Sequence, residues 1–152
     1  MTPRAVSKRI IADRLNLLSL FISEIRLLPL HDKAEFFSER RNIWAAESCL
    51  RRSLEALFDA GRHILAACSG RGVTEFKEIA VQLRELGVLN EEEASLMRSL
   101  AGYRNRLVHF YHEVSSDELF AICTSQLGDI QRLGAAIREW VRVHPEKCVE
   151  SL

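Results

Sequence analysis

The sequence predicts an all-α fold, an antiparallel bundle of about five helices in a single domain that spans residues 1–152. Three observations support this prediction. Apolar residues recur at helical spacing along most of the chain, capping signals precede successive segments, and short connections favour antiparallel neighbours. No stretch alternates convincingly as a strand would. With 47% hydrophobic and 28% charged residues, the composition is that of an ordinary soluble globular protein.

Two helices are expected in the first half of the chain. The first runs from about Arg4 to Leu28, where Pro29 ends it. The second is long, from about Glu35 to Cys68, and the break Ser69-Gly70-Arg71-Gly72 follows it. The apolar residues expected on their inner faces are Ile10, Leu17, Leu18, Phe21, Ile25 and Leu28 in the first helix, and Ile43, Leu50, Leu54, Leu57, Gly61 and Ile64 in the second.

Three further helices, joined by short connections, are expected in the second half of the chain. Thr74 is expected to cap the third helix, which ends at Gly87. The fourth and fifth helices each begin with a capping box, in which two side chains satisfy each other's free backbone amides. These boxes are Asn90 with Glu93 and Ser115 with Glu118. The fifth helix is expected to run to about Val143, and Pro145 stops it.

Charge and cysteine usage exclude several classes of function. The 21 basic residues balance the 21 acidic ones, so any contact with RNA would depend on a local basic patch. The four cysteines form no paired motif, which is typical of reduced thiols in a cytoplasmic protein. We therefore expect no metal site and no cofactor. The apolar runs are too short and too polar for a membrane span, and no signal peptide is expected.

The densest group of reactive side chains is Arg104–Tyr111, with the sequence Arg-Asn-Arg-Leu-Val-His-Phe-Tyr. The Arg104 guanidinium could bind a phosphate, and the His109 imidazole could transfer a proton near neutral pH. Together they could cleave RNA without a metal, because RNA supplies its own 2′-hydroxyl as the nucleophile. Most such pairs on helices are only surface residues, so a purely structural dimerisation bundle stays open as an alternative.

The faces of the fourth helix favour a homodimer. Arg104 and His109 diverge by about 140° on a straight helix, so either the helix loosens near His109 or two subunits assemble the site. Gly102 lies on a polar face and would let a second helix approach closely; otherwise it is merely tolerated and that face is exposed. The expected core face is Leu96, Leu100, Tyr103, Leu107 and Phe110, the polar face is Arg98, Gly102, Asn105, His109 and His112, and Met97, Ala101, Arg104, Val108 and Tyr111 lie between them.

The segment Arg104–Tyr111 resembles the R-x4-H-x-Y signature of HepT-like toxins in the HEPN superfamily. The resemblance continues, in order, through Phe36–Arg41, the E-A-x-x-D run in Leu54–Asp59 and the segment Leu83–Leu89, and it covers about residues 5–143. It implies an all-helical homodimer with its active cleft between the subunits. It also implies a metal-independent endoribonuclease that is the toxin of a toxin–antitoxin pair and is neutralised by a nucleotidyltransferase antitoxin.

The resemblance also implies roles for individual residues. Arg104 would bind the scissile phosphate, His109 would act as general acid or base, and Asn105 would orient the substrate or the imidazole. Tyr111 would be the tyrosine that the partner nucleotidyltransferase modifies with AMP. The chain departs from the family pattern at Phe110, a large apolar ring, and at His112, which either substitutes for His109 or is an exposed residue at the helix end.

Further candidates carry two interpretations each. Glu55 and Asp59 either orient Arg104 or His109, or belong to a surface ladder of weak charge pairs. A non-catalytic module that presents substrate or nucleotide to a nucleotidyltransferase is the alternative to an enzyme. Trp44 and Trp140 are expected to be core or interface anchors rather than platforms for RNA bases. The arginines that either line an RNA path or merely solvate the long helix are Arg40, Arg41, Arg51 and Arg52.

Overall fold

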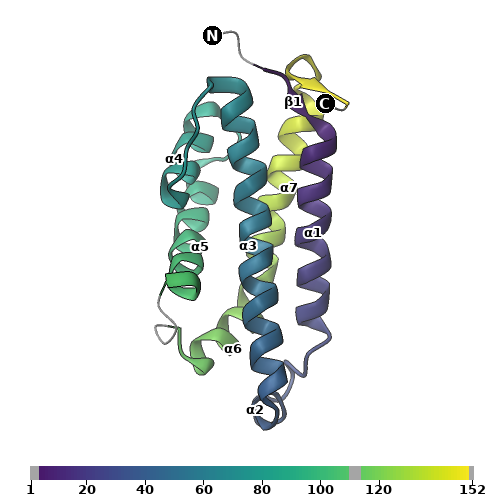
Figure 1. Cartoon of the computed structure of the whole chain (residues 1–152), viewed down its shortest axis with the longest axis vertical. Helices are drawn as coiled ribbons and strands as arrows, with labels where there is room; N and C mark the ends of the chain where they lie inside the picture. Colours follow the sequence, from purple (N-terminus) through teal and green to yellow (C-terminus); the bar gives the residue numbers. More distant parts are fainter. Residues whose placement is uncertain (1–3, 110–113, 151–152) are drawn as a thin grey trace.

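The computed structural model describes residues 4–109 and 114–150 and confirms the all-α antiparallel bundle (Figure 1). Within these residues, two of the five expected helices are each divided, so that seven helices occur. Two very short strands, β1 (Val6–Ser7) and β2 (Cys148–Val149), and the 3-10 turn η1 (Pro145–Lys147) accompany them. The helices are α1 (Lys8–Arg26), α2 (Lys33–Ser38), α3 (Arg40–Ser69), α4 (Phe76–Leu86), α5 (Glu91–His109), α6 (Ser116–Ser125) and α7 (Leu127–Val143).

Helix α3 is the centre of the bundle, because each of the other six helices packs against it. In Figure 1 it stands between α1 on one side and the α4–α5 pair on the other, with α7 behind. Its inner face is apolar along nearly its whole length, which provides the core with one continuous wall. The fully buried large residues of this wall are Leu50, Leu54, Leu57, Phe58, Ile64 and Leu65.

The long helix predicted from Glu35 is interrupted at Glu39, whose backbone is extended at φ −129° and ψ 124°. The Asn42 side chain donates a hydrogen bond of 3.1 Å to the carbonyl oxygen of Phe36, which replaces a helical partner at the break. The Phe36 ring packs on Phe120 of α6, with centroids 5.1 Å apart. This tertiary contact explains why α2 leaves the line of α3.

The helix predicted from Ser115 to Val143 is divided at Gln126. The hydroxyls of Thr124 and Ser125 donate to backbone carbonyl oxygens one turn back, at 3.0 Å and 2.6 Å, and such bonds compete with a regular helix. The predicted starts of α5 and α6 are accurate. Asn90 and Glu93 exchange capping bonds of 2.8 Å and 2.9 Å, and Ser115 accepts from the Glu118 amide.

The inner face of α1 differs from the predicted one. Ser7 caps the helix by accepting from the Ile10 amide, so α1 begins later than expected. Leu17 is 38% exposed and Phe21 is half-buried, because the whole predicted face is rotated toward the edge that α1 shares with α3. Helix α1 is apolar over more than half of its circumference, so periodicity alone does not show which residues lie at the centre of its buried face. The residues that are buried are Ile11, Leu15, Leu18, Ile22 and Ile25.

One smaller expectation, the cap of α4, also differs from the structure. Helix α4 begins at Phe76 after Glu75, one residue later than a Thr74 cap predicts, while Gly87 ends it with a left-handed φ of 88°. The four cysteines are free thiols, and burial raises the pKa of Cys123 to about 12. Among residues 4–109 and 114–150, no helix is long and apolar enough to cross a membrane.

The strands β1 and β2, which the sequence did not predict, pair in parallel at one end of the bundle. The Ser7 amide between β1 and α1 donates a hydrogen bond of 2.9 Å to Nε2 of His63 on α3. Burial, with a smaller contribution from the nearby Arg14, lowers the pKa of His63 below 6.5. A neutral His63 therefore fastens the start of α1 to the central helix.

This contact predicts a pH dependence of stability. Because the folded pKa lies below the unfolded value, the unfolded chain binds more protons between the two values. The contribution of His63 is complete above about pH 6.5 and is lost as the pH falls through the folded pKa. We expect the urea midpoint to fall more between about pH 7.5 and about pH 5 in the wild type than in His63→Gln, which keeps an acceptor but does not titrate. Identical pH profiles would contradict this role.

Candidate active site

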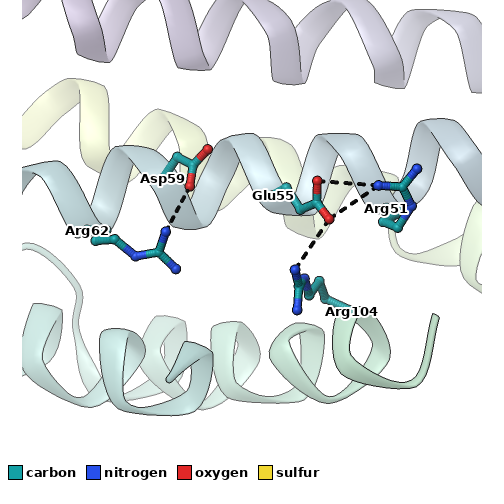
Figure 2. Close-up of polar contacts among 5 residues, drawn as sticks. All are labelled: Arg51, Glu55, Asp59, Arg62 and Arg104. Carbon is teal, nitrogen blue, oxygen red and sulfur yellow. Dashed lines mark hydrogen bonds and ion pairs between the residues drawn. The ribbon is translucent and has the colours of Figure 1, made fainter. Parts of the chain in front are cut away.

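The central feature of the site is an ion pair between α5 and α3. The Nη2 atom of Arg104 lies 3.4 Å from Oε1 of Glu55, and their side chains are 16% and 31% exposed (Figure 2). The same carboxylate also receives Nη1 of Arg51 at 3.3 Å, one turn earlier on α3. Two guanidinium groups thus share one carboxylate, and the group keeps a net positive charge.

The opposite side of the Arg104 guanidinium is covered by an aromatic ring. Its Cζ atom lies 4.0 Å from the centroid of Phe76, the first residue of α4. Phe76 also contacts the Arg62 guanidinium at 5.3 Å and packs edge-on against Phe58 at 5.0 Å. Cation–π contacts of this kind are stronger where water is excluded. Arg104 is therefore held between a carboxylate and a ring, which fixes the plane of its guanidinium.

One nitrogen of Arg104 is left without a partner. Its Nε atom is buried and makes no hydrogen bond to any residue that the structure describes. A buried unsatisfied donor costs about 1–3 kcal/mol, and native proteins keep few of them. The local cost marks Arg104 as a residue whose position serves something other than stability.

Asp59, the second predicted carboxylate, does not reach Arg104. It pairs with Arg62 at 3.2 Å and lies 4.0 Å from Arg14 of α1 (Figure 2). Its contacts match the surface-ladder interpretation, whereas Glu55 has the contact that the functional interpretation requires. Which role each carboxylate has stays a prediction.

Arg106, two residues after Arg104, points to a different neighbour. It forms a two-pronged contact of 2.8 Å and 2.7 Å with the carboxylate of Glu118 on α6. Residues 104 and 106 are about 200° apart around the helix, so the two arginines fix α5 from opposite sides. These two contacts therefore fix the rotation of α5 about its own axis near its C-terminal end.

Several predicted site residues lie partly or wholly outside the described part of the chain. The backbone of α5 extends to His109, but its side chain and the residues Phe110, Tyr111 and His112 are outside it. Asn105 is half-buried. A Cβ atom at Gly102 would meet nothing within 4 Å, so one protomer leaves this position open. The two explanations for Gly102 both remain, and the Arg104–His109 pairing stays a prediction.

The buried face of α5 is rotated from the predicted one. Met97 and Ala101, expected between the faces, are fully buried, while Tyr103 of the expected core face is half-buried. The reason is that α4 and α3 both cover α5, so its inner face points between them. Phe76 was not predicted as a site residue. The available signal was an aromatic ring in the first turn after the glycine-rich break. No group of three metal-binding side chains occurs within residues 4–109 and 114–150.

Comparisons with known proteins identify the family. Residues 18–137 match the family described as HepT-like ribonucleases. A protein named tRNA nuclease HepT, from Aphanizomenon flos-aquae, is 28% identical over 112 residues, which are 73% of this chain and 76% of that protein.

Solved structures share the fold. The tri-AMPylated HEPN toxin of Shewanella oneidensis in complex with the MNT antitoxin superimposes with a TM-score of 0.77 at 19% identity, over 86% of this chain and 97% of that chain. YutE of Bacillus subtilis, a cytosolic protein of unknown function, has a TM-score of 0.68 at 18% identity, over 92% of this chain and 94% of that chain. At these identities the likeness establishes the fold alone.

The ion pair can be tested with double-mutant cycles in urea unfolding. We expect Arg104→Gln and Glu55→Gln to couple by about 1 kcal/mol, because both side chains are partly buried. The cycle of Arg51→Gln with Glu55→Gln is the matched control and should give about 0.3 kcal/mol, as is usual for i,i+4 pairs on one helix. A larger coupling for Arg51 than for Arg104 would mean that Glu55 serves Arg51 instead.

Proposed function

This chain belongs to the HepT-like ribonuclease family, and we propose that it is a metal-independent endoribonuclease of the cytoplasm and the toxin of a toxin–antitoxin pair. The observation that carries the proposal is the fixed guanidinium of Arg104 between Glu55 and Phe76. An arginine held in this way offers a planar, permanently charged group to one phosphate. The activity named for the tRNA nuclease relative agrees with the proposal.

The proposed reaction is an internal transesterification of RNA. The 2′-oxygen of one ribose forms a bond to the adjacent phosphorus, and the bond from phosphorus to the 5′-oxygen of the next nucleotide breaks. The products are a 2′,3′-cyclic phosphate and a 5′-hydroxyl. His109 transfers a proton, either from the attacking 2′-hydroxyl or to the leaving 5′-oxygen.

Arg104 stabilises the negative charge that grows on the phosphate oxygens during this reaction. Glu55 is a positioning residue, because it holds Nη2 of Arg104 and prevents the long side chain from adopting other rotamers. Arg51 shares Glu55 and keeps the local charge positive, which favours an approaching phosphate. Asn105 orients the substrate or the imidazole, and Asp59 anchors Arg62 behind the site.

The active unit in this proposal is a homodimer. Arg104 and His109 diverge by about 140° on one regular helix, so a second copy of α5 is needed to complete the cleft. The open space at Gly102 supports this arrangement, because another backbone could approach there. The antitoxin partner is a nucleotidyltransferase that adds AMP to Tyr111, as the AMPylated Shewanella oneidensis toxin in complex with MNT suggests. A bulky, charged adduct two residues from His109 would obstruct the cleft.

Catalysis is tested with single-turnover RNA cleavage in buffer that contains EDTA. Arg104→Ala and His109→Ala should each reduce the rate by at least about 100-fold, as loss of an oxyanion-stabilising or proton-transferring group does. Arg142→Gln is the matched control, since its exposed guanidinium pairs with Glu139 on α7, which carries no residue of the proposed site, and it should keep most of the activity. Circular dichroism checks that all three variants fold. Wild-type protein that binds RNA but never cleaves it would instead support the non-catalytic binding module.

Antitoxin control is tested by co-expression with a nucleotidyltransferase encoded beside the gene, if one is present there. Mass spectrometry should detect AMP on Tyr111, and the modified protein should lose RNA cleavage. Tyr111→Phe should remain active and unmodified under the same conditions, because it lacks the acceptor hydroxyl. Full inhibition of Tyr111→Phe by the partner would show that complex formation, rather than AMP addition, silences the toxin.

A further inference from the structure

Trp44, near the start of α3, is the most unusual surface residue that the site does not use. Its side chain is 62% exposed, whereas Trp140 of α7 is only 4% exposed. The prediction of a core or interface anchor is confirmed for Trp140, and the structure removes the core interpretation for Trp44. Tryptophan is enriched at binding interfaces, where a partner covers its apolar ring. An exposed tryptophan therefore indicates a binding position.

Trp44 lies on the same side of α3 as the Arg104 site. Residues 44 and 55 are eleven apart, which is about three helical turns, so Trp44 and Glu55 project in nearly the same direction. At about 1.5 Å per residue they are separated by about 16 Å along the axis. Arg51 lies between them on this side and contacts Glu55. The path from Arg104 to Trp44 thus follows one continuous face of α3.

The direction of α5 adds a second constraint. In Figure 2 the α5 ribbon continues past Arg104 on the side of Arg51, which is the side of the N-terminal half of α3. Figure 1 shows the same arrangement, with the last turns of α5 beside the lower part of α3. The predicted catalytic end of α5 therefore points toward the part of α3 that carries Trp44.

The charge around Trp44 matches a phosphate backbone. The segment 40–52 contains four arginines and one acidic residue, Glu47, and with the flanking Glu39 and Glu55, which pair with Arg41 and Arg51, residues 39–55 carry a net charge of +1 in a chain that is neutral overall. One of the four, Arg41, is paired with Glu39 at 3.2 Å, and Arg52 lies 5.7 Å from the ring of Phe21. A second copy docked through this segment would bring two such positive charges together. A polyanion would be attracted to it.

We propose that Trp44 is a stacking platform for an unpaired nucleobase of the RNA substrate, a few nucleotides from the phosphate that Arg104 binds. This inference rests on the proposed ribonuclease function and specifies its substrate as single-stranded RNA. The arginines of segment 40–52 track the backbone, and the indole receives a base irrespective of its sequence. The combination of a basic path with an aromatic surface is how proteins bind single strands without reading their bases.

The two tryptophans make a direct optical test possible. The probe is a mixed-sequence 2′-O-methyl oligoribonucleotide, which lacks the nucleophilic hydroxyl and can be added to the wild-type protein without being cleaved. Stacking should quench the emission of the exposed Trp44, and Trp44→Phe should abolish this quenching because only the buried Trp140 remains. Fluorescence anisotropy of a labelled probe measures binding independently of the indole signal.

Kinetics with cleavable RNA provide the second readout. Trp44→Ala should raise KM about ten-fold with little change in kcat, in keeping with the loss of one base-stacking contact. Trp44→Phe should stay within about three-fold of the wild type, because a ring is retained. Leu20→Ala, at another exposed apolar residue, is the matched control and should leave both constants unchanged.

Three results would overturn the proposal. If anisotropy shows saturated binding while the emission of Trp44 is unchanged, no base stacks on it, and the ribonuclease function still stands. If Trp44→Ala converts a dimer to a monomer in analytical ultracentrifugation, Trp44 is an interface anchor. If the wild-type chain neither binds nor cleaves RNA, the proposed function fails together with the platform.

Discussion

The fold of the site depends on one constraint, which is that the Arg104 guanidinium is mostly buried and must be compensated where it lies. An unpaired buried charge would cost several kcal/mol, so Glu55 on α3 and Phe76 on α4 have to meet Arg104 together. A single side chain of α5 therefore contacts two other helices. The unsatisfied Nε shows that this compensation is incomplete. A stability requirement alone would favour an apolar residue at this position.

Helix α5 carries a second anchor, Arg106, which contacts a different helix from those that Arg104 contacts. Arg106 binds Glu118 across the interval that contains residues 110–113, so the two ends of that interval are joined by a two-pronged ion pair. Arg104 sets which side of α5 faces α3, and Arg106 sets where α6 begins relative to α5. The two arginines therefore have different roles in positioning α5.

The sequence is informative where the determining interactions are local. The capping box of Asn90 and Glu93, the end of α4 at Gly87 and the end of α3 at the break that begins with Ser69 follow from neighbouring residues and were predicted. The breaks at Glu39 and Gln126 depend on side chains that bond to the backbone and on the packing of Phe36 against Phe120, which no periodicity reveals. Strands of two residues are too short to give a pattern.

The site shows the same division between local and distant information. The motif itself could be predicted from the sequence, as could two candidate carboxylates. The choice between them could not, because Glu55 and Asp59 are one turn apart and only the packing of α5 decides which one meets Arg104. The overall charge of zero is similarly uninformative, since it is a sum over separated regions: three glutamates begin α5, while four arginines lie within residues 40–52 of α3. The glutamates pair with Arg84 and Arg132. Because α5 runs toward the arginine-rich part of α3, an RNA strand would be drawn to the end of α5 that carries His109.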